Sequence, residues 1–210
     1  FHEIPDGDRA HYSKRTVDVE YRYPFGVKEL WGLTYRSDYD LQNHARASSK
    51  DFNYFDQETR ERYVPHVIEP TFGVDRTALV VLLSAFSEIE GGRTTTTEAN
   101  KEVETVLRLP AELAPFKAAI LPLSKKEPLT RIAHEIAGKL RERWMIDYDE
   151  VASIGRRYRR QDEIGTPYCI TVDFESLEDH KVTVRDRDTM QQERIAIEEL
   201  TSYLAPKLNS

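Results

Sequence analysis

The chain has 210 residues, 39% hydrophobic and 32% charged, which is enough for an apolar core, and no apolar run approaches the ~20 residues that span a bilayer. Its formal net charge of −7 disfavours indiscriminate nucleic-acid binding. It allows a local basic surface in residues 117–210, where 16 basic residues nearly balance 17 acidic ones. The single cysteine, Cys169, excludes an internal disulfide and a thiolate metal cluster, which fits a reducing cytoplasm.

The first half has the pattern of an antiparallel sheet with a helix. Apolar and polar residues alternate in 14–23 and 28–36, which predicts two strands, and 64–70 predicts a third strand that Pro70 ends. The apolar stretch 75–86 contains no helix breaker and opens on Asp75, a suitable N-cap or first-turn acid, so it predicts a buried helix.

The chain begins at Phe1 rather than at a methionine, and we therefore expect it to be a portion of a longer protein. Its periodicity is interrupted by Gly-Gly at 91–92 and by the Pro-rich stretch 107–115. We place a domain boundary there, which gives domains of residues 1–106 and 107–210.

In the second half, strand and helix patterns alternate, which predicts a small α/β layer domain. Cys169 falls within a predicted strand, where it is expected to be a small core residue. The predicted strands are 116–124, 145–150, 166–174 and 180–186. The predicted helices are 128–144 and a closing helix at 188–204, and 152–165 is predicted to be a short basic helix or turn.

The stretch HVIEPTFGVDRT, residues 66–77, carries the most chemistry in a short space. Glu69, at the end of a strand, could hold an ammonium group, although an ordinary edge-strand salt bridge is an alternative. Thr71 adds a hydroxyl on the same strand face, and Gly73 permits close approach of a ligand to the backbone. Arg76, where a helix begins, suits a base or a phosphate, with a salt bridge to Asp75 as the alternative.

Together, E-P-T-x-G-V-D-R between a strand and a helix resembles motif 3 of the class II aminoacyl-tRNA synthetases, here within residues 66–86. Residues 10–56, the stretch RRYRRQDEIGTPYCITVDF and the stretch TVRDRDTMQQ resemble the bacterial dimeric glycyl-tRNA synthetases. The resemblance extends over essentially the whole chain. It implies part of the antiparallel class II catalytic sheet with a helix, followed by a mixed-sheet anticodon-binding domain.

The resemblance also implies roles for individual residues. Glu69 would hold the amino group of glycine, and Arg76 would contact the nucleotide; these two are the candidate catalytic residues. Where the family has Ser after the motif 3 proline, this chain has Thr71, whose extra methyl group could tighten or disturb a glycine pocket. The implied glycine site comprises Glu69, Pro70, Thr71, Phe72, Gly73 and Arg36. The implied ATP site comprises Glu29, Leu30, Gly73, Val74, Asp75 and Arg76, with Glu29 also holding Mg²⁺ directly or through water.

Residues 153–165, SIGRRYRRQDEIG, place four arginines around an aromatic residue. Such a cluster suits RNA, because guanidinium groups contact phosphates and rings stack on bases. The alternative is a solvated basic helix face balanced by Asp162 and Glu163. Arg185 and Arg187 could equally form ion pairs at a sheet edge. The candidate tRNA-binding residues are Arg156, Arg157, Tyr158, Arg159 and Arg160.

The activity implied by the resemblance is ATP- and Mg²⁺-dependent joining of glycine to tRNA(Gly) by a cytoplasmic homodimer with no membrane partner. In the family, motifs 1 and 2 lie upstream of the segment that Phe1 matches, so we expect this portion to be inactive alone. The alternative is a non-catalytic, synthetase-like accessory subunit that binds tRNA or a primer.

Overall fold

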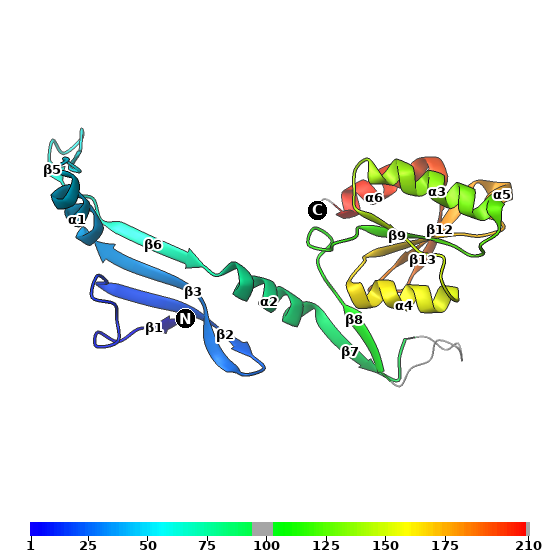
Figure 1. Cartoon of the computed structure of the whole chain (residues 1–210), viewed down its shortest axis with the longest axis horizontal. Helices are drawn as coiled ribbons and strands as arrows, with labels where there is room; N and C mark the ends of the chain where they lie inside the picture. Colours follow the sequence, from blue (N-terminus) through cyan, green and yellow to red (C-terminus); the bar gives the residue numbers. More distant parts are fainter. Residues whose placement is uncertain (94–102, 209–210) are drawn as a thin grey trace. The chain divides into compact units, whose positions relative to one another are not determined.

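The computed structural model describes residues 1–93 and 103–208, which divide into two compact units, Phe1–Val81 and Leu82–Ser210 (Figure 1). Each unit is described by itself. Among the described residues, no helix combines the length and apolar character needed to cross a membrane.

The first unit is built on an antiparallel sheet with the strand order β1-β2-β3-β6. A minimal hairpin, β4–β5, lies between α1 and β6 in the sequence, and α2 follows β6 directly. The elements are β1 (His2–Glu3), β2 (Arg15–Tyr23), β3 (Gly26–Ser37), α1 (Tyr39–Ser48), β4 (Tyr54–Phe55), β5 (Arg62–Tyr63), β6 (Val67–Phe72) and α2 (Val74–Ala85). The strands predicted at 14–23 and 28–36 are confirmed as β2 and β3.

The third predicted strand is confirmed, but the prediction that Pro70 ends it is wrong. β6 continues through Pro70, which lies opposite Leu33, and ends at Phe72. Because β6 is the last strand of its sheet, a residue without an N–H group is tolerated there. The strand therefore carries Thr71 in a fixed register with β3.

The predicted helix at 75–86 is confirmed as α2, with Asp75 in its first turn, but the expectation that it is buried is wrong. Only Ala85 of this helix is buried, whereas Leu79 and Leu82 remain 38% and 49% exposed. No described part of the chain covers these leucines enough to bury them. Apolar composition predicted the helix but could not show whether a covering layer is present.

The second unit contains a hairpin and a five-stranded mixed sheet with the order β10-β9-β11-β12-β13. β9 pairs in parallel with β10 and β11, and the two remaining pairs are antiparallel. The strands are β7 (Phe86–Glu90), β8 (Val103–Leu107), β9 (Ala118–Pro122), β10 (Ile146–Tyr148), β11 (Tyr168–Val172), β12 (Lys181–Asp186) and β13 (Gln192–Ala196). The helices are α3 (Glu127–Arg141), α4 (Ile154–Ile164), α5 (Ser176–Asp179), the 3₁₀ helix η1 (Ile197–Glu199) and α6 (Leu200–Leu208).

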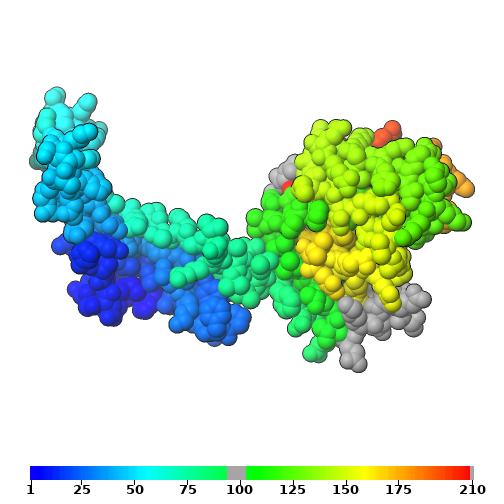
Figure 2. All heavy atoms as spheres, in the orientation of Figure 1, coloured from blue at the N-terminus to red at the C-terminus, as the bar shows by residue number. Residues whose placement is uncertain are grey.

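Helices cover both faces of this sheet, as predicted for an α/β layer domain, and α3 and α4 form part of its visible surface (Figure 2). Ala118 and Ile120 of β9 join the core that includes α3 and α6. Their neighbours Ala119 and Leu121 pack with Cys169 against α4. Burial raises the pKa of Cys169 to about 12, which keeps the thiol protonated at neutral pH. The expectation of a small core cysteine is confirmed.

The closing helix predicted at 188–204 is wrong in its first half. Residues Gln192–Ala196 form strand β13, and α6 begins only at Leu200. The side chains of 192–196 favour helix moderately, but pairing with β12 outweighs this local preference. The turn before β13 is fixed by Asp186, whose carboxylate accepts hydrogen bonds from the backbone N–H groups of Asp188 and Thr189.

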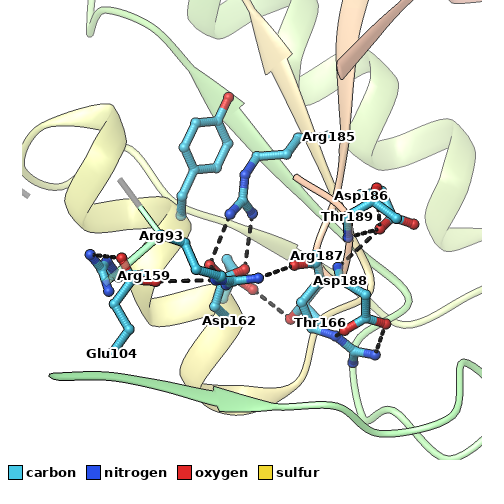
Figure 3. Close-up of polar contacts among 12 residues, drawn as sticks. Arg93, Glu104, Arg159, Asp162, Thr166, Arg185, Asp186, Arg187, Asp188 and Thr189 are labelled. Carbon is cyan, nitrogen blue, oxygen red and sulfur yellow. Dashed lines mark hydrogen bonds and ion pairs between the residues drawn. The ribbon is translucent and has the colours of Figure 1, made fainter. Parts of the chain in front are cut away.

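A buried ionic network ties the β7–β8 hairpin to the sheet domain (Figure 3). Arg93 donates to Glu104 of β8 at 3.1 Å and to Asp162 of α4 at 2.8 Å. Arg185 of β12 donates to both oxygens of Asp162 at 2.9 Å, and Arg159 pairs with Glu104. All of these side chains are at most 11% exposed, so each charge depends on its partners.

This network agrees with the assignment of the β7–β8 hairpin to the second compact unit, which begins at Leu82. All of the β7–β8 hairpin except Leu107 precedes the predicted boundary, yet β8 contacts α4 and belongs with the second unit. The predicted domain boundary between residues 106 and 107 stays a prediction about domain organisation. Residues 94–102, part of the predicted break, lie outside the described residues.

We predict that Arg93→Ala destabilises the second unit by about 3 kcal/mol, because removing one partner leaves buried carboxylates uncompensated. The measurement is the urea dependence of amide hydrogen exchange at Ile170 and Val184, which reports on this unit. The matched control is Arg131→Ala, whose exposed ion pairs should contribute at most about 0.5 kcal/mol. Equal effects of both substitutions would contradict a stabilising role for the network.

A second prediction concerns the stability of the second unit at low pH. Burial acts to raise the pKa of Glu104, but hydrogen bonds from Arg93 and the charge of Arg159 outweigh it, so the pKa lies below its ordinary 4.5. Glu104 then binds a proton more readily in the unfolded chain than in the folded one. The stabilisation that its charged form gives to the fold is therefore lost as pH falls below about 4.5. The stability difference between the unsubstituted chain and Glu104→Gln should therefore shrink in that range, measured by the same exchange. A constant difference would contradict this linkage.

Candidate functional site

One face of the first sheet is polar, and the register of its strands decides which side chains share it. Thr34 of β3 lies opposite Glu69 of β6, and Gly32 lies opposite Thr71. On the other side of β3, Asp18 of β2 pairs with Gly32. Because side chains alternate along a strand, these five residues point to one face.

Glu69 is held on this face by Arg36. The Nη1 group of Arg36 donates to Oε2 of Glu69 at 2.6 Å. The remainder of the guanidinium group is bound by Asp40, with Nε at 2.6 Å and Nη2 at 2.7 Å from its two oxygens. The ring of Tyr12 lies 3.9 Å from the guanidinium carbon. The salt bridge considered as an alternative role for Glu69 is therefore present in this structure, and it links two predicted site residues.

The residues predicted to form the glycine-binding site do not all lie on the same face of the sheet. The hydroxyl of Thr71 lies 3.5 Å from Oε1 of Glu69, on the polar face. Pro70 and Phe72 alternate to the opposite face, where Phe72 meets Trp31 edge to face with ring centroids 5.3 Å apart. The structure thus brings together Glu69, Thr71 and Arg36, and it separates the side chains of Pro70 and Phe72 from them.

The turn from β6 into α2 is fixed by hydrogen bonds that the sequence did not indicate. The indole N–H of Trp31 donates to the Thr77 hydroxyl at 2.9 Å, and that hydroxyl donates to the Gly73 carbonyl at 2.8 Å. A Cβ atom on Gly73 would make an ordinary van der Waals contact with the side chain of Arg76, at 3.5 Å. Trp31 and Thr77 therefore position the start of α2 beside the candidate site.

Arg76 pairs with Glu29 rather than with Asp75, which was the alternative considered from the sequence. Its Nη1 group donates to the Glu29 backbone carbonyl at 2.9 Å and lies 3.1 Å from a carboxylate oxygen of the same residue. Both side chains are about half exposed, so the pair can open to a ligand at little cost. Leu30 is buried, whereas Val74 and Asp75 are exposed at the start of the helix.

Two carboxylates approach the same point above Gly32. A Cβ atom there would lie 3.6 Å from Oε1 of Glu29 and 3.7 Å from Oδ1 of Asp18. Burial raises the pKa of Asp18, and the nearby charge of Glu29 raises it further. Oxygen ligands of this kind fit Mg²⁺, which usually takes one or two carboxylates together with substrate phosphates. Sequence reasoning found Glu29 but missed Asp18, because only the strand pairing brings it near.

In the second unit, the arginines of α4 divide into buried and accessible groups. Arg157 is buried and donates to the carbonyls of Pro122 and Asp149 at 2.7 and 3.1 Å, and burial lowers its pKa. Arg159 is buried against Glu104, and the hydroxyl of Tyr158 lies 2.6 Å from that of Thr171. Arg157 and Arg159 are held inside the domain, and Tyr158 is half-buried beside them.

The other two arginines of α4 reach solvent. Arg156 is exposed, and Arg160 is 42% exposed while it donates to Asp149 from Nε at 3.0 Å. Arg157 and Arg159 are instead buried, and the assignment of the cluster to tRNA binding stays a prediction. Arg185 and Arg187 do form ion pairs, with Asp162 at 2.9 Å and with Asp188 at 2.7 Å, but both side chains are buried, and β12, which carries Arg185, is an inner strand of the sheet.

Comparison with known proteins places both units in one kind of protein. Residues 117–207 match the family model described as an anticodon binding domain. The chain is 51% identical to the glycine–tRNA ligase of Thermobifida fusca over 99% of its own length and 45% of that relative. It is 55% identical to the ligase of Staphylococcus saprophyticus and 54% identical to that of Geobacillus kaustophilus, in each case over 95% of this chain and 41% of the relative.

The chain thus spans somewhat less than half the length of the relatives it matches. The matches include the strand–turn–helix segment of the first unit and the whole sheet of the second. Residues 117–207 are thus similar to anticodon binding domains, and the chain as a whole is similar to a portion of the glycine–tRNA ligases.

Proposed function

We propose that this chain is the part of a glycine–tRNA ligase that carries motif 3 and binds the anticodon. The whole enzyme would activate glycine with ATP to glycyl-adenylate and then transfer glycine to tRNA(Gly). The observation that carries the proposal is identity of 51% over 99% of the chain with a protein of that name. The geometry supports it, because Glu69, Glu29 and Arg76 all lie around one strand–turn–helix segment.

At the amino-acid end of the site, Glu69 would accept hydrogen bonds from the ammonium group of glycine. Its Oε2 is held by Arg36, and its Oε1 lies beside the Thr71 hydroxyl. A carboxylate fixed in this way is oriented before the substrate arrives, which lowers the entropy cost of binding. Thr71 would limit the space next to the glycine Cα, because a pocket excludes a larger amino acid by steric overlap.

At the nucleotide end, Arg76 and the first N–H groups of α2 would receive phosphate oxygens. Glu29, with Asp18 beside it, would hold Mg²⁺, which would neutralise phosphate charge when bound. The glycine carboxylate is the nucleophile: it forms a bond to the α-phosphorus as the bond to pyrophosphate breaks. No protein nucleophile is needed, so these residues act by positioning the reactants and stabilising charge.

The second unit would contact tRNA(Gly) through its anticodon binding domain. Arg156 and Arg160 of α4 are the candidates from the arginine cluster whose guanidinium groups can reach an RNA phosphate. The proposal extends to a homodimer acting in the cytoplasm, as the resemblance implies. A non-catalytic accessory subunit is not favoured, since Glu29, Glu69 and Arg76 occur together in a chain whose similar relatives carry the ligase name.

The proposal predicts that this chain alone catalyses no glycine-dependent exchange of pyrophosphate into ATP. A chimera in which the chain replaces the matching 45% of the Thermobifida fusca relative should catalyse it. Glu69→Gln in the chimera should lower kcat/KM for glycine by about 10- to 100-fold, because a charged acceptor becomes neutral. Glu61→Gln, at an exposed position, is the matched control.

Exchange by the isolated chain would show that its residues suffice for adenylate formation and would contradict the expected incomplete site. A folded chimera that exchanges no pyrophosphate with glycine would contradict the proposed function itself.

For tRNA, we predict that Arg156→Ala weakens binding of tRNA(Gly) by the chain. It should also reduce the slope of the logarithm of the binding constant against the logarithm of the salt concentration by about one. Its thermal stability should stay unchanged, because the side chain is exposed. Arg157→Ala should instead lower the melting temperature, because it removes buried hydrogen bonds. Filter binding at several salt concentrations and calorimetry separate the two effects, and equal binding by Arg156→Ala would remove α4 from the RNA surface.

A further inference from the structure

We propose that Asp40 is a positioning residue for glycine recognition: it engages Arg36 so that Glu69 keeps an oxygen and a negative charge for the ammonium group of the substrate. This inference rests on the proposed function and adds a residue outside the motif 3 segment. Asp40 lies in the first turn of α1, four residues after Arg36.

The first step of the argument is geometric. Arg36 presents a planar fork of N–H donors, and Asp40 takes the Nε and Nη2 side of that fork at 2.6 and 2.7 Å. Only the Nη1 group then points to Glu69, at 2.6 Å. The Tyr12 ring stacks against the guanidinium group at 3.9 Å and restricts the plane of the fork. In this arrangement Glu69 accepts one hydrogen bond from Arg36, whereas Asp40 accepts two.

The second step concerns the oxygen that remains. Oε2 of Glu69 is engaged by Arg36, whereas the contact of Oε1 with the Thr71 hydroxyl is long, at 3.5 Å. The Glu69 side chain is 43% exposed, compared with 21% for Asp40 and 19% for Arg36. A ligand can therefore reach Oε1 of Glu69 while the Arg36–Asp40 pair stays enclosed behind it.

The third step is charge balance. Two carboxylates share one guanidinium group, so the cluster of Arg36, Asp40 and Glu69 keeps one uncompensated negative charge. An ammonium group completes that balance. Without Asp40, Arg36 would neutralise Glu69 and compete with the substrate for it. The hydrogen bonds that Arg36 donates to Asp40 and then to Glu69 raise the pKa of Arg36, and the bond from Arg36 lowers the pKa of Asp40, so the charges of Arg36 and Asp40 persist at neutral pH.

The test compares Asp40→Asn with Asp38→Asn in the chimera described above. Asp38 precedes the same helix, but its carboxylate accepts hydrogen bonds from Gln42 and Ser37 rather than from Arg36. In glycine-dependent pyrophosphate exchange, Asp40→Asn should raise the KM for glycine by about tenfold and leave the KM for ATP within about twofold. Asp38→Asn should leave both within about twofold, and Asp40→Glu should recover part of the loss.

The outcomes separate the two proposals. If the unsubstituted chimera shows no glycine-dependent exchange, the proposed function fails, and the role of Asp40 fails with it. If that chimera is active and Asp40→Asn matches Asp38→Asn, only the role of Asp40 is overturned. A parallel rise in both KM values together with a lower melting temperature would also overturn it, because such changes indicate a structural role.

Discussion

The register between β3 and β6 is the constraint on which the rest of the candidate site depends. It sets Glu69 and Thr71 opposite Thr34 and Gly32, so that the carboxylate and the hydroxyl share a face. A slip of one residue would turn both to the opposite face, which carries Trp31 and Phe72. The Trp31–Thr77–Gly73 hydrogen bonds then fix where the strand ends and the helix begins, and this helix start holds Arg76 against Glu29.

Local patterns predicted much of the fold from the sequence. Alternation identified β2 and β3, and the Asp at the start of an apolar run identified α2, because both signals depend on neighbours along the chain. The predictions for Pro70 and residues 192–196 were wrong for the opposite reason. Whether a proline ends a strand depends on whether that strand is an edge, and whether a helix-favouring segment forms a strand depends on a partner distant in sequence.

The candidate site shows the same difference between local signals and contacts distant in sequence. The motif residues Glu69 and Arg76 could be recognised from their order in the chain, but their partners could not. Asp40 and Tyr12 were not singled out, and only tertiary structure brings them to Arg36. For the arginines of α4, composition did not show which side chains are buried. A basic sequence that contains an aromatic residue has the same composition whether its side chains face RNA or a buried carboxylate. A helical period assigns faces to residues, but it does not say which face is covered.

The shared carboxylates of the buried network limit how these positions can change over evolutionary time. Asp162 serves both Arg93 and Arg185, and Glu104 serves both Arg93 and Arg159. A charge reversal at Asp162 would place a third positive charge beside Arg93 and Arg185 and leave Glu104 as the remaining carboxylate of the network. The residues of the network are therefore expected to change together. Related sequences should retain the whole set or replace all of it with apolar side chains, and sequences that keep only some of the charges should be rare.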